Sequence, residues 1–385
     1  MIPYGRQDIQ ADDIEAVLSV LRSDYLTQGS AVPAFEMAVS NYVNVPHVVA
    51  VSSATAALHI ACLALGLGKN GLLWTTPNTF VATSNAALYC GADVDFVDID
   101  PKTYCMSYTE LAEKLDRTKK SRARLPDIVA PVHFAGQSCD MKSIYELSKK
   151  YGFKIIEDAS HAIGGDADGG KIGHSLYSDI TVFSFHPVKI ITTGEGGALT
   201  TRNPELAIKL VELRSHGITR DAQRMVGPSD GPWYYQMIDL GYNYRMTDIH
   251  AALGLSQLKK IDQFIARRRE LAASYDVLLS KFPLTCPWQD PEGKSAYHLY
   301  PVVLEPQFKR GSVFGKMRAS GIGVNVHYIP VHLQPYYQIM GFKAGDFPNA
   351  EAYYNSAMTI PLYASMSDTQ QMTVVSTLKN ILDKH

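Results

Sequence analysis

Seven short apolar runs alternate with helical segments along the first half of the chain, and this order constrains the fold more than any other feature. The runs cover residues 47–52, 72–76, 94–99, 128–134, 154–158, 180–185 and 198–201. Between several of them, the apolar spacing predicts helices at residues 56–65, 81–88 and 143–150. Uninterrupted apolar strands require a sheet that is covered on both faces. The pattern therefore predicts an α/β fold with a large, doubly wound, mainly parallel sheet.

The two ends of the chain differ from this alternating region. The first helix is expected to begin near Asp12 and Asp13, because acidic side chains favour a helix N-terminus. After about residue 250 the pattern predicts a long charged helix over 257–280, strands at 299–304 and 324–328, and a closing helix at 368–382. We therefore expect an N-terminal helix and large domain over residues 1–250 and a small α+β domain over residues 251–385.

Composition excludes several classes of function. The 385 residues carry 36 basic and 38 acidic side chains, a formal charge of −2, which gives no general electrostatic attraction to nucleic acids or anionic membranes. No run approaches the roughly 20 apolar residues that span a bilayer. The charged N-terminus is typical of mature sequence rather than a secretory leader. Five widely spaced cysteines without CxxC favour reduced thiols and a cytoplasmic protein.

Two motifs resemble ligand sites but fit them poorly. Residues 66–71 read GLGKNG, yet the expected helix precedes these glycines and the strand follows, the reverse of a dinucleotide-binding fingerprint. Residues 166–170 read DADGG, but the twelfth position of a calcium loop would be Tyr177, which supplies no carboxylate. A helix end and a surface hairpin are expected instead. No histidine or cysteine spacing indicates a metal site.

Three other motifs place reactive groups at strand ends. Residues 52–57 read SSATAA, where small residues and free N–H groups at a helix start can hold a phosphate, although Ser53 or Thr55 can equally be an ordinary cap. Asp158 ends a buried strand, where a carboxylate needs a partner such as a protonated pyridine nitrogen or another cation. Lys189 follows another strand and precedes a glycine-rich turn, a setting that lowers a lysine pKa and permits a Schiff base.

These motifs together resemble a known family. The segments SFHPVKIITTGEGG, EDASHA, SSATAALH and GYNYRMTDIHAALGLSQL are similar to the signatures of the DegT/DnrJ/EryC1/StrS family. The resemblance covers nearly the whole chain and implies a fold type I (aspartate aminotransferase-like) sugar aminotransferase that depends on pyridoxal 5'-phosphate.

The resemblance implies a cofactor role for each matching position. Lys189 would form the covalent aldimine and move protons, and Asp158 would keep the ring nitrogen protonated. His161 would lie against the ring or its hydroxyl. The remaining cofactor contacts implied are Phe80 on the ring face, Ala54, Thr55 and Ser184 at the phosphate, and Asn243 reaching the phosphate of a partner subunit. A homodimer with shared active sites is therefore implied.

The resemblance also implies a substrate site. Its residues come from the N-terminus, from the loop at 24–27 and from the small domain: Tyr4, Asp24, Tyr25, Leu26, Thr27, His327, Tyr328, Ile329 and Pro330. Segments such as YLTQG, RSHGITRD and VHYIPVHLQPYY favour, within the family, amination at C4 of a UDP-linked 4-keto-6-deoxy-N-acetylhexosamine in pseudaminic acid biosynthesis, with L-glutamate as donor.

Alternatives remain open at this stage. A C4 aminotransferase for a differently configured sugar, of the bacillosamine/legionaminic or perosamine type, would share every motif above. A regulatory protein that binds pyridoxal phosphate without turnover is a candidate of another class. Relatives that replace the lysine by histidine become dehydratases, so Lys189 favours transamination.

Overall fold

A seven-stranded sheet forms the centre of the molecule in a computed structural model that describes residues 1–384. The strand order is β1–β9–β8–β5–β4–β2–β3, and only β9 runs against its neighbours. The strands are β1 (His47–Val51), β2 (Leu72–Thr75), β3 (Asp93–Phe96), β4 (Ile128–Ala130), β5 (Lys154–Asp158), β8 (Ile180–Ser184) and β9 (Gly197–Thr201). All seven runs expected from the sequence are strands, and the prediction of a doubly wound, mainly parallel sheet is confirmed.

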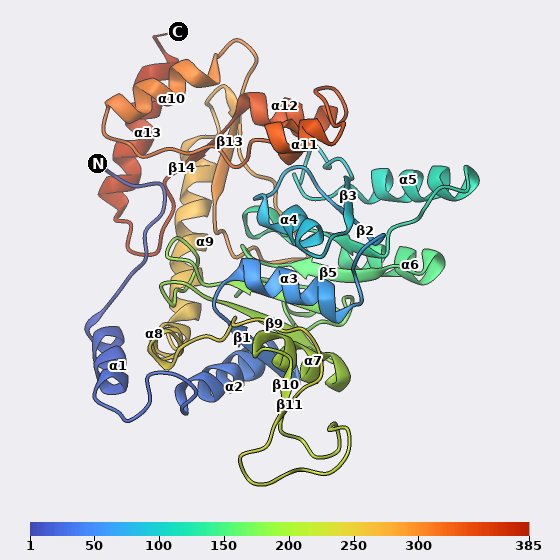
Figure 1. Ribbon diagram of the computed structural model, residues 1–385. Helices are drawn as coiled ribbons and strands as arrows, with labels where there is room; N and C mark the ends of the chain where they lie inside the picture. Colours follow the sequence, from blue (N-terminus) through green and yellow to red (C-terminus); the bar gives the residue numbers. More distant parts are fainter. Residues whose placement is uncertain (385) are drawn as a thin grey trace.

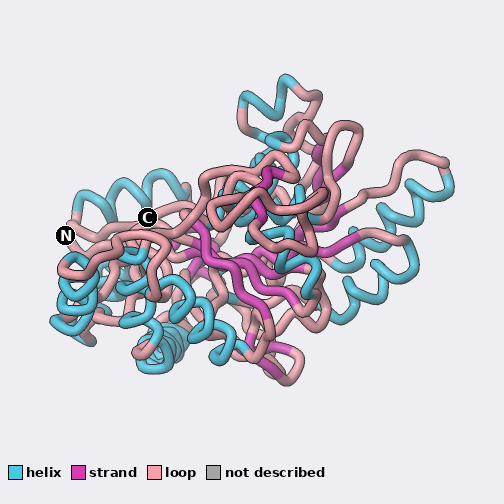
Figure 2. The backbone as a smooth tube through the Cα atoms, turned by 60° about the horizontal axis from the view of Figure 1, so that its bottom comes forward, coloured by secondary structure: helices cyan, strands magenta, loops and turns pink. Residues whose placement is uncertain are grey.

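Alternate residues of each strand enter different apolar layers, which explains why the strands are apolar throughout. Val49 of β1 packs with α3 in one layer, whereas Ala50 packs with α2 and Phe183 in another. Figure 2 shows the strands in the middle of the molecule with helices around them. The helices beside the sheet are α2 (Ala31–Val43), α3 (Ala54–Ala64), α4 (Ala82–Tyr89), α5 (Tyr108–Lys120), α6 (Met141–Tyr151), α7 (Pro204–Arg214) and α8 (Asp248–Leu258).

The C-terminal part forms a smaller α+β unit. A three-stranded sheet in the order β12 (Leu284–Thr285), β13 (Tyr300–Leu304) and β14 (Ala357–Ile360) packs with α10 (Arg310–Ala319) and α13 (Asp368–Leu382). Helix α9 (Ile261–Leu278) runs towards this unit from the level of α8 (Figure 1). Two short helices, α11 (Pro335–Ile339) and α12 (Pro348–Ser356), precede β14.

One element prediction in this part is confirmed with shifted bounds, and one is wrong. The helix expected over 257–280 is α9, over 261–278, whereas residues 257 and 258 belong to the end of α8. Between the two helices, the Lys260 amine binds Asp12 and Asp13 of α1 (Ala11–Leu21). The strand expected over 324–328 is reduced to one bridge between Asn325 and Thr359. There the Asn325 side chain accepts from the next backbone N–H, which competes with sheet pairing.

The N-terminal residues cross to the C-terminal unit. Ile2 pairs with Ile322, and the Tyr4 carbonyl accepts from the Leu362 N–H at 3.0 Å. The division of the chain at residue 250 stays a prediction.

The two motifs that resemble ligand sites, at residues 66–71 and 166–170, form the helix end and the hairpin that the sequence predicted. Gly66 follows the end of α3 with φ of 86°, in the left-handed region that favours glycine. Residues 166–171 form the hairpin of β6 (Asp166–Ala167) and β7 (Gly170–Lys171). Within residues 1–384, no helix is both long and apolar enough to cross a membrane.

Asp248, the first residue of α8, gives a test of how the loop before α2 is held. Its buried carboxylate accepts from the N–H groups of Gly29, Ala31 and Val32 at 2.6, 2.8 and 3.1 Å. Because Asp248→Ala leaves three donors without an acceptor, we expect the apparent free energy of unfolding in urea to fall by about 3 kcal/mol. The same substitution at the exposed Asp230 is the control, and equal small effects at both positions would contradict this account.

Candidate active site

Asp158 lies buried at the carboxyl end of β5, in the middle of the sheet. Thr83 donates its hydroxyl to Oδ2 at 2.7 Å, and Ser160 donates its hydroxyl and N–H to Oδ1 at 2.6 and 3.1 Å. A carboxylate can accept about four hydrogen bonds. Asp158 is therefore held in one orientation and still has capacity for a further cationic N–H donor.

Lys189 lies in the turn between β8 and β9. Its backbone N–H donates to the carbonyl of His186 at 2.9 Å, which closes the turn. Burial of the amine lowers the pKa of Lys189 to about 8, and the negative charge of Asp158 opposes this shift. About a tenth of the amine is therefore neutral at pH 7, far more than for an ordinary lysine, and the neutral amine is the nucleophilic form.

An anion cradle forms where β8, β9 and α3 meet. Ser184 pairs with Gly197, and a Cβ at Gly197 would lie 2.7 Å from the nitrogen of Ala54, so only glycine permits this close approach. Ser53 caps α3 by accepting from the N–H of Ala56 at 3.1 Å. The N–H groups of Ala54 and Thr55 lie in the first turn, where no carbonyl of the helix accepts from them. Such groups bind phosphate.

Two neutral histidines lie beside the amine. His161 Nδ1 accepts from the Ala135 N–H at 3.2 Å, and its Nε2 lies 3.0 Å from the Tyr328 hydroxyl. Burial, with the charges of Lys189 and His327, lowers the pKa of His161 well below its usual value. Burial and the charge of Lys189 likewise lower the pKa of His327 to about 3. Both ring nitrogens of His161 are therefore engaged by the protein, and its ring lies 4.5 Å from that of His298.

Aromatic rings extend this cluster towards solvent. Phe80 follows β2 and is 59% exposed, with its ring 6.3 Å from that of Tyr328. Tyr4 lies 5.3 Å from His327, ring to ring, and His327 lies 5.0 Å from Tyr328. Three residues that the sequence associated with the substrate therefore converge from opposite ends of the chain.

Other residues expected at the site do not contact the cluster around Lys189 within this subunit. Within residues 1–384, neither the exposed side chains of the 24–27 loop nor that of Asn243 makes a hydrogen bond or ring contact with the Lys189 group. The loop is instead tied to α8, where the Asp248 N–H donates to the Leu26 carbonyl at 3.0 Å. Ile329 is exposed, and Pro330 is buried.

Sequence reasoning missed three residues of the site. Thr83 and Ser160 hold Asp158, and their closeness in sequence to the predicted residues Phe80 and Asp158 was a usable signal. His298 had none. It is buried with its ring 4.5 Å from that of His161, and its Nδ1 has no hydrogen-bond partner in the described part of the chain.

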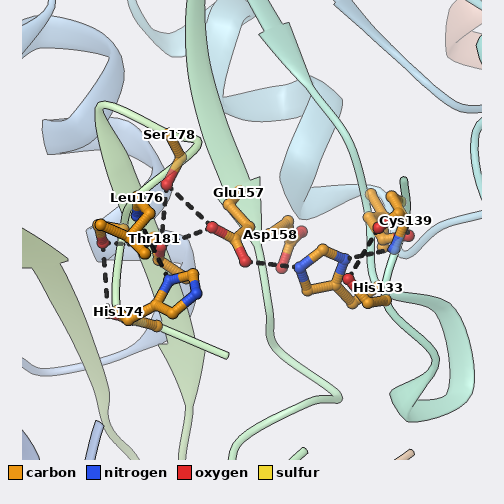
Figure 3. A network of polar contacts seen from close by, with 12 residues as sticks. His133, Cys139, Glu157, Asp158, His174, Leu176, Ser178 and Thr181 are labelled. Atoms are coloured by element: carbon orange, nitrogen blue, oxygen red, sulfur yellow. Dashed lines mark hydrogen bonds and ion pairs between the residues drawn. The ribbon is translucent and has the colours of Figure 1, made fainter. Parts of the chain in front are cut away.

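A second buried carboxylate supports the strand that carries Asp158. Glu157 points away from Asp158, and it interacts with His133 at 2.7 Å and accepts from Thr181 and Ser178 at 2.8 and 2.9 Å (Figure 3). Burial alone would raise the pKa of Glu157, but these hydrogen bonds outweigh it and lower the pKa. The network joins β5 to β8 behind the site.

These groups fit pyridoxal phosphate. The cradle at Ala54 and Thr55 suits its phosphate, Asp158 suits a protonated ring nitrogen, Phe80 offers a stacking face, and Lys189 offers an amine for its aldehyde. The fold and site define the class as a pyridoxal phosphate enzyme of the aminotransferase type.

Comparisons with known proteins agree with this class. The model of the DegT/DnrJ/EryC1/StrS aminotransferase family matches residues 7–379. The chain is 40% identical over 396 residues to the UDP-4-amino-4,6-dideoxy-N-acetyl-beta-L-altrosamine transaminase of Campylobacter jejuni, covering 100% of this chain and 98% of the relative. It is 38% identical to the spore coat polysaccharide biosynthesis protein SpsC of Bacillus subtilis, with 99% and 97% covered.

Solved structures show the same similarity over full length. Helicobacter pylori PseC, an aminotransferase involved in the biosynthesis of pseudoaminic acid, superimposes with a TM-score of 0.90 at 29% identity, with 100% of both chains covered. The putative sugar aminotransferase Spr1654 of Streptococcus pneumoniae matches in its PLP form with a TM-score of 0.89 at 28% identity, covering 100% and 99%. The chain belongs to the DegT/DnrJ/EryC1/StrS aminotransferase family, and it is an aminotransferase that uses pyridoxal phosphate.

The lowered pKa of Lys189 predicts how the cofactor-free protein takes up pyridoxal phosphate. Because the neutral amine reacts, the rate of covalent uptake should rise with pH and reach half its maximum near 8. Stopped-flow absorbance of the bound cofactor measures this rate. Lys189→Ala should give no covalent band, whereas Lys69→Ala, at an exposed lysine, should behave like the wild type. A flat rate from about pH 6 to 10 would contradict the assignment.

Glu157→Gln tests the network behind the site. The amide oxygen can face either the two hydroxyls on Oε2 or the His133 ring on Oε1, and the amide NH2 then meets a donor on the other side. We therefore expect the apparent free energy of unfolding at pH 7 to fall by about 3 kcal/mol. Because the folded pKa of Glu157 is lowered, its contribution is present above the ordinary pKa and is lost as pH falls through the folded value. In urea unfolding, the stability of the variant should therefore not show the decrease at acidic pH that Glu157 causes in the wild type. Glu113→Gln, at an exposed residue, is the control.

Proposed function

We propose that this aminotransferase transfers the amino group of L-glutamate to C4 of a UDP-linked 4-keto-6-deoxy-N-acetylhexosamine. The products would be UDP-4-amino-4,6-dideoxy-N-acetyl-beta-L-altrosamine and 2-oxoglutarate, which places the reaction in pseudaminic acid biosynthesis. The observation that carries this proposal is the 40% identity over the whole chain to a relative of that name. The full-length likeness to PseC supports it.

The chain's own groups suit transamination. Pyridoxal phosphate, when bound, supplies an aldehyde that accepts an amine and a ring that withdraws electrons from the reacting carbon. Lys189, with its lowered pKa, would take the α-proton from glutamate and later give a proton to C4 of the sugar. Asp158 would hold the proton on the ring nitrogen, and Thr83 and Ser160 keep its carboxylate oriented.

A homodimer is part of this proposal. Asn243 is exposed between Tyr242 and Tyr244, whose rings stack at 5.0 Å, and the adjoining segment exposes Trp233, Met237 and Leu240. Such an apolar surface suits association. The loop at 24–27 exposes Tyr25 and Leu26 as well. We expect Asn243 and this loop to meet the cofactor and sugar of a partner subunit.

The proposed location is the cytoplasm. All five cysteines are free thiols, which suits a reducing compartment.

A second candidate is C4 amination of a differently configured nucleotide sugar. The relatives do not share one name, because SpsC, a spore coat polysaccharide biosynthesis protein, is 38% identical to this chain, close to the 40% of the transaminase. Identity of this size establishes the chemistry more firmly than the configuration of the sugar.

A product assay separates the candidates. The enzyme is incubated with L-glutamate and with one of two UDP-4-keto sugars, the β-L-arabino 4-hexulose or its α-D-xylo isomer, and products are identified by mass spectrometry and NMR. We expect amination of the first sugar. Amination of the second alone would move the protein to the second candidate. A cofactor band that glutamate fails to bleach would indicate a binding protein without turnover.

A further inference from the structure

The hydrogen bonds of His161 determine where its proton lies. Its Nδ1 accepts from the backbone N–H of Ala135, and an amide N–H can only donate. Because the ring is neutral, the proton must be on Nε2. The contact at 3.0 Å is therefore a hydrogen bond from His161 Nε2–H to the oxygen of Tyr328.

The backbone at Ala135 enforces this arrangement. Ala135 has φ of 57°, in the left-handed region that a residue with a side chain rarely adopts. The neighbouring carbonyl groups are held by a second segment, since the Ala296 and Leu299 N–H groups donate to Gly136 and Ala135 at 3.1 and 3.3 Å. The strained conformation aims the Ala135 N–H at His161 and keeps the histidine in one tautomer.

The Tyr328 hydroxyl is left with a proton of its own to donate. Its oxygen accepts from His161, and no other hydrogen bond of this hydroxyl exists within residues 1–384. Burial, with the charges of Tyr4 and Asp158, raises the pKa of Tyr328, so the O–H persists at any working pH. The neighbouring His327 differs, because its two nitrogens already interact with Thr359 and Asn325 at 2.8 and 3.3 Å.

We propose that the Tyr328 hydroxyl, oriented by His161, donates a hydrogen bond to the C4 carbonyl oxygen of the keto sugar. This inference rests on the proposed function. Tyr328 lies among the side chains expected at the cofactor and the sugar: its hydroxyl contacts His161, and its ring lies 6.3 Å from Phe80 and 5.0 Å from His327. A donor on the carbonyl oxygen makes C4 more electrophilic and positions it for amination. In the glutamate half the ketone of 2-oxoglutarate forms only at the last step, after the cofactor absorbance has changed, so the rate of that absorbance change should not depend on this bond.

Measuring the two half-reactions separately distinguishes a hydrogen bond to the sugar carbonyl from a role of Tyr328 in cofactor binding. Tyr328→Phe keeps the ring and removes the donor. The glutamate half is followed by single-turnover absorbance with the pyridoxal form, and the sugar half with the pyridoxamine form. We expect the sugar half to slow by about 50-fold and the glutamate half to change by less than about twofold.

A matched variant controls for packing. Tyr353 is buried in the same aromatic cluster, 5.7 Å from Phe134, which itself lies 6.3 Å from Tyr328. Its hydroxyl has no hydrogen-bond partner in the described chain, so Tyr353→Phe should leave both halves unchanged.

Binding without turnover gives a second measurement. In calorimetry with cofactor-free protein, the wild type should bind the UDP-4-keto sugar about fivefold more tightly than the UDP-sugar that lacks the C4 oxygen. Tyr328→Phe should abolish this difference. The wild-type comparison tests for a donor to that oxygen even if the variant does not fold.

Each other outcome overturns the inference in a recognisable way. Equal slowing of both halves, with a changed cofactor spectrum, would show that Tyr328 binds the cofactor instead. The proposed bond would be contradicted if Tyr328→Phe left the rate of the sugar half unchanged. It would also be contradicted if the wild type bound the UDP-4-keto sugar and the UDP-sugar without the C4 oxygen equally well. If the wild type aminates neither keto sugar, the proposed function fails, and the inference that rests on it fails with it.

Discussion

The buried carboxylate of Asp158 is the interaction on which the rest of the site depends. A charge at the end of a central strand is costly unless it is paired and hydrogen-bonded. Thr83 and Ser160 satisfy it from two different elements, and Lys189 lies close enough to feel its charge. These interactions bring α4, the turn after β5 and the turn after β8 to one edge of the sheet. The charge of Lys189 is thus influenced by the same carboxylate that would pair with a protonated ring nitrogen.

Two consecutive carboxylates on β5 have opposite environments because strand side chains alternate between faces. Asp158 faces the ligand edge, whereas Glu157 faces the layer behind it and interacts with His133, Thr181 and Ser178. The second network stiffens the strand without reaching the ligand. A site that must hold its groups to within a fraction of an ångström needs such support from outside the contact layer.

Much of this arrangement is predictable from sequence, and the reasons for failure are specific. The seven strands are apolar enough to be recognised. Asp158 ends β5 and Lys189 lies in the turn after β8, on the side of the sheet where parallel strands bind ligands. The contact of Lys260 with α1 was not predictable, since it joins residues that are 248 positions apart in the sequence. His298 gave no signal either, because its place beside His161 comes from tertiary packing alone.

The histidines around Lys189 contribute directed hydrogen bonds rather than positive charge. Burial holds the pKa of His161, His298 and His327 below the usual value, and the nearby Lys189 ammonium reinforces this. Three protonated imidazoles would repel that ammonium, whereas neutral rings have one donor and one acceptor nitrogen each. Local hydrogen bonds then fix which nitrogen donates, as the Ala135 N–H does for His161. The positive potential for a phosphate is supplied separately by the start of α3, so anion binding and carbonyl recognition rest on different parts of the fold.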